Sequence, residues 1–103
     1  MAKRKVIWTE TSRRQRRFVL EYWLHRNGAP DFSIRLLKII SDRVKIIAKY
    51  PNSFRLSQFK DTRVSVFGHY SIFYKITDTQ IIITGFWDNR QDPEGLLTFI
   101  ANL

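Results

Sequence analysis

The chain has 103 residues, of which 44% are hydrophobic and 15% aromatic, so we expect one folded domain over residues 1–103 rather than a disordered chain. It contains no cysteine, which excludes disulfides and thiolate metal sites. Eighteen Lys and Arg against nine Asp and Glu give a net charge of +9, which favours a nucleic acid or an acidic protein as partner. No apolar run reaches the length of a membrane span or a signal peptide, so we predict a cytoplasmic protein without a membrane partner.

A short strand and a helix are predicted at the start of the chain. Residues 3–8 have the pattern of the strand. Ser12 is followed three residues later by Gln15, the spacing of a capping box, so we expect a helix to begin at this point and to end near His25. Its predicted apolar stripe consists of Val19, Tyr22 and Trp23, with Phe18 beside them.

The same helix carries the densest basic run of the protein, which contains Arg13, Arg14, Arg16 and Arg17. The run covers more than one helical turn, so the arginines cannot all share one face. They form either a solvated outer face or a docking surface for phosphates or acidic side chains. A charge run by itself favours neither interpretation.

A second helix is predicted from Asp31 to the end at Tyr50-Pro51, because Pro30 and Asp31 suit a first helical turn. Only a short connection separates the two helices, so we expect an antiparallel helical pair. Its apolar stripe consists of Phe32, Leu36, Ile40, Val44 and Ile47, and is widened by Leu37 and Ile39.

Strands are predicted over residues 62–67, 70–76 and 80–87, after a loop over 51–61, and a short helix over 94–103. This order favours an α+β fold, in which an antiparallel sheet packs against the N-terminal helical hairpin.

The alternation within the strand over 70–76 predicts which side chains face the core. Ser71 and Lys75 are expected on the face directed away from the helices, together with Arg63 of the preceding strand, where a partner could contact them. The core face is predicted to hold Tyr70, Ile72, Tyr74 and Ile76.

The chain resembles the RelE/ParE superfamily of toxins from bacterial type II toxin–antitoxin systems. The resemblance covers nearly the whole chain, and its order of elements agrees with the one predicted above. The segments that carry it are Val6-Ile7-Trp8, Glu21-Tyr22-Trp23, Ile47-Ala48-Lys49-Tyr50-Pro51, Tyr70-Ser71-Ile72-Phe73-Tyr74-Lys75-Ile76 and Trp87-Asp88-Asn89-Arg90-Gln91-Asp92-Pro93.

The resemblance implies a microbial-RNase-like sheet, a cognate antitoxin with an acidic or amphipathic segment, and one of two activities. RelE-like members cut mRNA in the ribosome, and ParE-like members poison DNA gyrase by protein binding without an active site. A ribosome-dependent mRNA endonuclease, which would be an enzyme that binds RNA, is the first hypothesis. The gyrase poison is the second, and a basic binding module without toxicity is the third.

Cleavage of RNA through its 2′-hydroxyl requires a base, an acid and cations around the phosphorane. For the nuclease hypothesis we assign Arg63, Lys75 and Arg90 as the cations, and His69 as the group that titrates near neutral pH. RelE-like nucleases usually place an Arg where this chain has Ser71, and that departure favours the gyrase hypothesis.

Each of these residues has a structural alternative. His69 at a turn is more often structural than catalytic, and Arg90 between two aspartates would brace the loop that follows the last strand. Lys75 would be solvated or paired across the sheet. Trp87 is either a core residue, which its apolar neighbours favour, or a platform for a stacked base. No spacing of His, Asp and Glu predicts a metal site, and no cofactor is expected.

Overall fold

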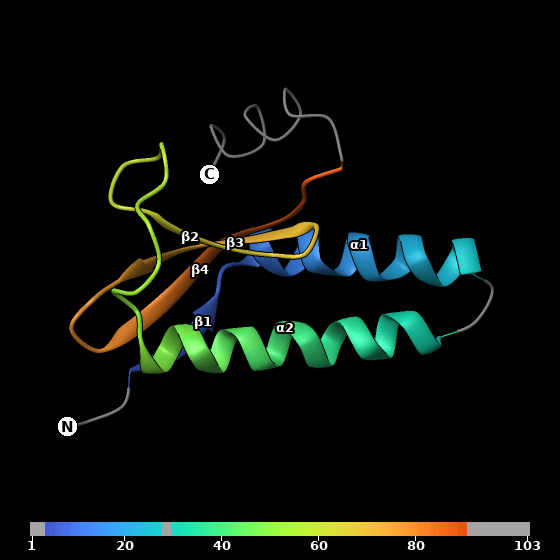
Figure 1. Ribbon diagram of the computed structural model, residues 1–103, viewed down its shortest axis with the longest axis horizontal. Helices are drawn as coiled ribbons and strands as arrows, with labels where there is room; N and C mark the ends of the chain where they lie inside the picture. The colour runs from blue at the N-terminus through green and yellow to red at the C-terminus, as the bar shows by residue number, and fades with distance from the viewer. Residues whose placement is uncertain (1–3, 28–29, 91–103) are drawn as a thin grey trace.

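The computed structural model describes residues 4–27 and 30–90 and has the α+β architecture expected from the sequence. Figure 1 shows two helices side by side in opposite directions, with the sheet packed where the first helix begins and the second ends. The helix expected over 94–103 lies outside the described residues. In chain order the elements are β1 (Lys5–Trp8), α1 (Glu10–Asn27), α2 (Asp31–Lys49), β2 (Arg63–Phe67), β3 (Tyr70–Ile76) and β4 (Gln80–Asp88).

The four strands form one sheet in the order β1-β4-β3-β2. Strands β2, β3 and β4 are the antiparallel part that the sequence predicts, whereas β1 pairs with β4 in parallel. A parallel pair requires a long crossover, and here both helices and two strands separate its members. The sheet is therefore mixed.

A β-bulge divides β4 into two halves. Phe73 lies opposite Gly85 and Tyr74 lies opposite Ile83, so Thr84 is an additional residue in the β4 strand. Such a residue shifts the alternation of side chains between the two faces of the sheet. As a result the fully buried Phe86 and Ile83 lie on the same face of the sheet, the one that the helices cover, although they are three positions apart in the sequence.

The core lies between the helices and this face, which we call the helix face. Tyr70, Ile72 and Tyr74 of β3 are buried there, as predicted. The expectation that Ser71 is open to a partner on the other face is wrong, because Ser71 is 4% exposed and its hydroxyl donates to Oδ1 of Asn89 at 2.9 Å. The stripe of α2 is also confirmed: Leu36, Ile40 and Ile47 are buried, and Phe32 and Val44 pack against them.

Some residues assigned to the apolar stripes of α1 and α2 are exposed, so the predicted stripes are too wide. Leu37 and Ile39 do not widen the stripe of α2, because they are 44% and 51% exposed. Each lies about 100° around the helix axis from its buried neighbour, which directs it past the sheet. On α1, Phe18 and Tyr22 are 58% and 46% exposed, whereas Val19 is buried and Trp23 packs at the edge of the core.

Helix α1 begins three residues earlier than the predicted capping box. The hydroxyl Oγ1 of Thr9 accepts the backbone N–H of Ser12 at 3.1 Å, so Thr9 occupies the capping position. Ser12 is buried inside the first turn. Gln15 is also buried, and its Oε1 accepts the backbone N–H of Phe86 at 2.8 Å instead of serving α1.

Replacement of Thr9 by Ala is expected to lower the free energy of unfolding by about 1 kcal/mol, because the N–H of Ser12 loses its acceptor. Urea denaturation followed by circular dichroism measures the change. Thr9→Ser, which keeps the hydroxyl, is the control and should stay within about 0.5 kcal/mol of the parent. Equal destabilisation by the two substitutions would show that the methyl group, and not the cap, matters.

Tyr74 ties β3 to the loop after α2. Its buried hydroxyl donates a hydrogen bond of 2.6 Å to the carbonyl of Pro51, and burial raises the pKa of Tyr74 to about 12. We expect Tyr74→Phe to cost about 1 kcal/mol at neutral pH, the usual contribution of one hydrogen bond.

The raised pKa also predicts the direction of the pH dependence. The contribution of Tyr74 is complete below the pKa of an unfolded tyrosine, about 10, and is lost as the pH rises through about 12. Denaturation between pH 8 and 11.5 should show a smaller decline for Tyr74→Phe than for the parent. An identical decline would exclude Tyr74 as its source.

Candidate functional site

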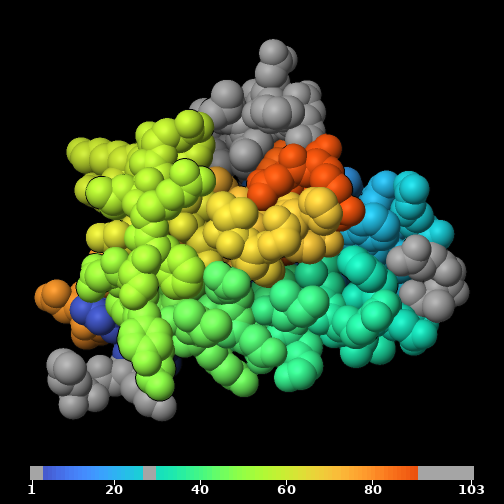
Figure 2. All heavy atoms as spheres, viewed as in Figure 1, coloured from blue at the N-terminus to red at the C-terminus, as the bar shows by residue number. Residues whose placement is uncertain are grey.

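The end of β4 forms a compact polar cluster with the turn between β2 and β3. Two nitrogens of Arg90 donate to the carboxylate of Asp88, Nε to Oδ1 at 2.9 Å and a terminal nitrogen to Oδ2 at 2.7 Å. The backbone N–H of Arg90 donates to the same Oδ1 at 2.9 Å. In Figure 2 the orange-red surface of this segment lies against the gold surface of the β2–β3 turn. Arg90 is thus fixed in a bidentate pair.

Aromatic rings frame this pair. The Arg90 guanidinium lies 4.8 Å from the ring centre of Trp23 on α1 and also donates to the hydroxyl of Tyr70 at 3.3 Å. The ring of Tyr70 stacks on Phe86 at 5.7 Å. The cluster therefore connects α1, β3 and β4.

The electrostatics of the cluster follow from burial and from the pair. Burial acts to raise the pKa of Asp88, but the hydrogen bonds and charge of Arg90 outweigh it and hold this pKa below its usual value. The hydrogen bonds to Asp88 in turn raise the pKa of Arg90. Burial and the charge of Asp88 raise the pKa of Tyr70, which keeps its hydroxyl protonated.

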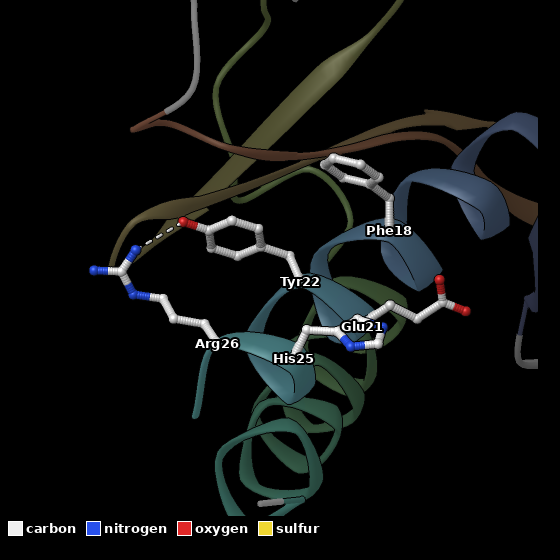
Figure 3. A pocket seen from close by; sticks show the side chains of 5 residues that line it. All are labelled: Phe18, Glu21, Tyr22, His25 and Arg26. Carbon is white, nitrogen blue, oxygen red and sulfur yellow. Dashed lines mark hydrogen bonds between the residues drawn. The ribbon is translucent and has the colours of Figure 1, made fainter. Parts of the chain in front are cut away.

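An exposed ridge on α1 lies next to the cluster. Figure 3 shows Phe18, Glu21, Tyr22, His25 and Arg26 around a shallow hollow on this helix, with the Tyr22 hydroxyl accepting a hydrogen bond of 3.1 Å from Arg26. A neighbouring hollow extends from Tyr22 to Arg90. Exposed aromatic rings beside arginine are typical of protein interfaces. The ridge is therefore a candidate contact surface for a protein.

Arg63 does not lie on the face where the sequence places it. It pairs in register with Tyr74, so its side chain belongs to the helix face, and the expectation that it emerges beside Ser71 and Lys75 is wrong. One of its terminal nitrogens donates to the carbonyl of Phe54 at 2.6 Å. Arg63 anchors the loop that precedes β2.

Among the other three residues assigned to nuclease chemistry, Lys75 is separated from His69 and Arg90. Lys75 is exposed on the opposite face of the sheet, which we call the second face. His69 lies in the β2–β3 turn, and its carbonyl accepts the N–H of Asn89 at 2.6 Å. His69 and Arg90 are neighbours at one end of β3. Lys75 lies five residues along that strand from Tyr70, about 17 Å away.

The four arginines of the basic run on α1 do not share one face of the helix, as their spacing predicts. Arg13, Arg14 and Arg17 are exposed, and Arg14 forms an ion pair of 2.7 Å with Glu10. Arg16 instead lies with its guanidinium 4.3 Å from the ring centre of Trp8, and burial together with the charges of Arg13 and Arg17 lowers its pKa. Three of the four arginines therefore face solvent.

Trp87 lies on the second face of the sheet, opposite Ser71, and is half-buried. It is therefore outside the core on the helix face. The bulge at Thr84 explains this position, because it exchanges the faces to which the last residues of β4 point.

The contacts of Trp23 and Tyr70 with Arg90 could not be predicted from the sequence. The spacing of both rings predicts core residues, and nothing in one sequence indicates that a core ring will lie beside a guanidinium. The sequence signal for the site is Arg90 close to Asp88, and the two form an ion pair of 2.7 Å. The alternative that Arg90 braces the loop toward the last expected helix stays a prediction, because residues 91–103 lie outside the described part of the chain. Within residues 4–27 and 30–90, no group of three or more His, Asp or Glu side chains is placed to hold a metal ion. No helix in that same part of the chain has the length and apolar character needed to cross a membrane.

The fold is shared with a solved toxin–antitoxin structure. A helical hairpin on one face of a four-stranded sheet is the architecture expected of the RelE/ParE superfamily. A solved structure of the chromosomal ParDE TA system from P. aeruginosa contains a chain that matches with a TM-score of 0.73 and 16% sequence identity, over 82% of this chain and 94% of that chain. No curated protein sequence matches.

The family model for the ParE toxin of the type II toxin-antitoxin system, parDE, matches residues 6–93. The chain therefore belongs to the ParE toxin family, and it is a toxin of a type II toxin–antitoxin system. Membership of such a family implies a cognate antitoxin. Of the two activities implied by the resemblance, the family match favours the ParE-like one over the RelE-like nuclease.

Proposed function

We propose that this toxin inhibits growth by binding and poisoning DNA gyrase in the cytoplasm, as a protein inhibitor without an active site of its own. The match of the ParE family over residues 6–93 carries the proposal. ParE-like members of the superfamily are gyrase poisons, and the departure at Ser71 from the RelE-like pattern agrees with that branch.

The separation of the assigned catalytic residues supports the same proposal. A general base and acid must reach the reacting atoms within hydrogen-bond distance. Arg63 is engaged on the helix face and Lys75 lies on the second face, while Arg90 is held by Asp88 at the far end of β3. These cations cannot surround one phosphorane in this arrangement.

The cognate antitoxin is proposed to cover basic surface with an acidic or amphipathic segment. The exposed Arg13 and Arg17 and the ridge with Tyr22 and Arg26 offer charges and aromatic rings on one helix. An acidic segment with apolar anchors complements both. Failure of a coexpressed acidic neighbour to co-purify with the toxin would count against this proposal.

The deciding experiment compares the two targets side by side. Purified toxin is added to DNA gyrase, ATP and relaxed circular DNA, and both supercoiling and protein-linked DNA breaks are measured. The same preparation is added to a translating extract, in which mRNA ends are mapped by primer extension. We expect loss of supercoiling, accumulation of breaks and intact mRNA. Cuts confined to ribosome-engaged mRNA, with normal gyrase activity, would establish the nuclease instead.

A further inference from the structure

A third hollow lies on the side of the sheet away from the core, between the loop before β2, strands β3 and β4, and the start of α1. Its volume is about 350 Å³. Lys60 and Lys75 line it together with the rings of Phe59 and Phe73 and four threonines, and none of its eight lining residues is acidic. The hollow is separate from the Asp88–Arg90 cluster, whose residues do not line it.

The loop that carries Lys60 is held in place by its own hydrogen bonds. The Ser57 hydroxyl donates to the carbonyl of Thr62 at 2.7 Å and accepts the N–H of Phe59 at 3.1 Å. The Thr62 hydroxyl donates to the carbonyl of Lys60 at 2.8 Å. Asp61 has a φ of 53°, a conformation that costs a non-glycine residue about 1 kcal/mol or more and persists only where its surroundings impose it.

This loop places an aromatic ring over the sheet. The ring of Phe59 meets that of Phe73 edge-on, with the ring centres 5.6 Å apart. Lys60, the next residue, is thereby fixed on the same side of the sheet as Lys75. The two ammonium groups belong to separate elements that pack together, and not to one flexible segment.

The chemistry of this lining matches a phosphodiester backbone. Ammonium groups neutralise phosphate charge, and hydroxyls such as those of Thr11 and Thr84 donate to phosphate oxygens. The half-buried ring of Phe59, which lies against the buried Phe73, gives a sugar or base an apolar contact. An acidic protein segment also carries carboxylate and carbonyl oxygens that accept from these hydroxyls, so the choice of a phosphodiester over such a segment rests on the proposed function.

We propose that this hollow holds the sugar–phosphate backbone of DNA, so that the toxin contacts the DNA segment bound by gyrase as well as the enzyme. The choice of DNA rests on the proposed function, because gyrase presents DNA to whatever binds beside it. Lys60 and Lys75 each neutralise one phosphate in this arrangement.

The test compares two double variants that remove the same charge. Lys60→Gln/Lys75→Gln alters the hollow, whereas Lys38→Gln/Lys45→Gln alters exposed lysines on α2, across the molecule. Binding of a fluorescent 20-base-pair duplex is measured by anisotropy between 50 and 300 mM salt, without gyrase. We expect the hollow variant to bind at least tenfold more weakly and its log–log salt slope to fall by about 1.8, or 0.9 for each phosphate. The α2 variant should change affinity less than threefold.

Equal losses in the two variants would overturn the proposal, because they would show only the effect of net charge, and so would unchanged binding by the hollow variant. Tighter binding of a single-stranded RNA of the same length than of the duplex would overturn the assignment to DNA. Lys60→Arg/Lys75→Arg keeps both charges and should keep the parent salt slope. Thermal melting of each variant separates loss of binding from loss of fold.

The gyrase assay then distinguishes this proposal from the function on which it rests. If the parent toxin does not inhibit gyrase, the proposed function fails, while the DNA titration still decides the role of the hollow. If the parent inhibits gyrase, the hollow variant should require at least tenfold more protein for equal inhibition. Unchanged inhibition by that variant would overturn the DNA contact within the gyrase complex.

Discussion

Replacement of Arg90 by Ala is expected to lower the free energy of unfolding by about 2 kcal/mol. Removing one partner of a buried ion pair typically costs about 3–5 kcal/mol, because the other charge remains without compensation. The side chain of Asp88 is only 8% exposed, but that of Arg90 is 40% exposed, so solvent screening reduces the expected effect. Urea denaturation at pH 7 measures it.

A double-mutant cycle isolates the pair. Asp88→Asn removes the charge that Arg90 compensates, so Arg90→Ala should cost much less in that background than in the parent. An equal cost in both backgrounds would assign the effect to the stacking of Arg90 on Trp23. Circular dichroism verifies that the three variants remain folded.

The same pair predicts a loss of stability in acid. Since the pKa of Asp88 is lower in the folded than in the unfolded chain, its contribution is complete above the unfolded value, about 4, and disappears as the pH falls through the folded value. Asp88→Asn should therefore lose less stability between pH 5 and 2 than the parent. Parallel curves would show that other carboxylates govern acid unfolding.

Replacement of Gln15 by Leu is expected to destabilise the protein by about 2 kcal/mol, because the N–H of Phe86 would be buried without an acceptor. Strand β1 pairs with residues 80–83 of β4, which precede the bulge. After the bulge, the acceptor for the backbone N–H of Phe86 comes from Gln15 on α1 instead of from a neighbouring strand. Chemical denaturation gives the overall loss. Hydrogen exchange at Phe86 should also accelerate relative to exchange at Ile81 in the middle of the sheet.

Gln15→Glu is the matched control, since it keeps an acceptor oxygen but introduces a buried carboxyl group. Burial would raise the pKa of that group, so the variant should be destabilised at pH 7 and should recover relative to the parent as the pH falls and the carboxyl group becomes protonated. If Gln15→Leu and Gln15→Glu lose the same stability at every pH, the hydrogen bond to Phe86 does not explain the role of Gln15.

Part of the candidate site could be predicted from the sequence. The pairing of Arg90 with a flanking aspartate and the exposure of Lys75 follow from short sequence separations and from strand alternation. The face occupied by Arg63 could not be predicted correctly, because its register with Tyr74 is set by the turn and by packing with α2. The contact of Trp23 with Arg90 joins residues far apart in sequence, for which local pattern carries no signal.

The sequence by itself determined the α+β class, the helical hairpin, the three-stranded meander and the buried faces of α2 and β3. All of these depend on a period of 3.6 or 2 that is visible within single segments. Only the tertiary structure decided the parallel pairing of β1, the bulge at Thr84 and the faces taken by Phe86, Trp87 and Asp88. The physical reason is that one additional residue in a strand reverses every later side chain, and its position depends on contacts such as that of Gln15 with Phe86, which join segments 71 residues apart.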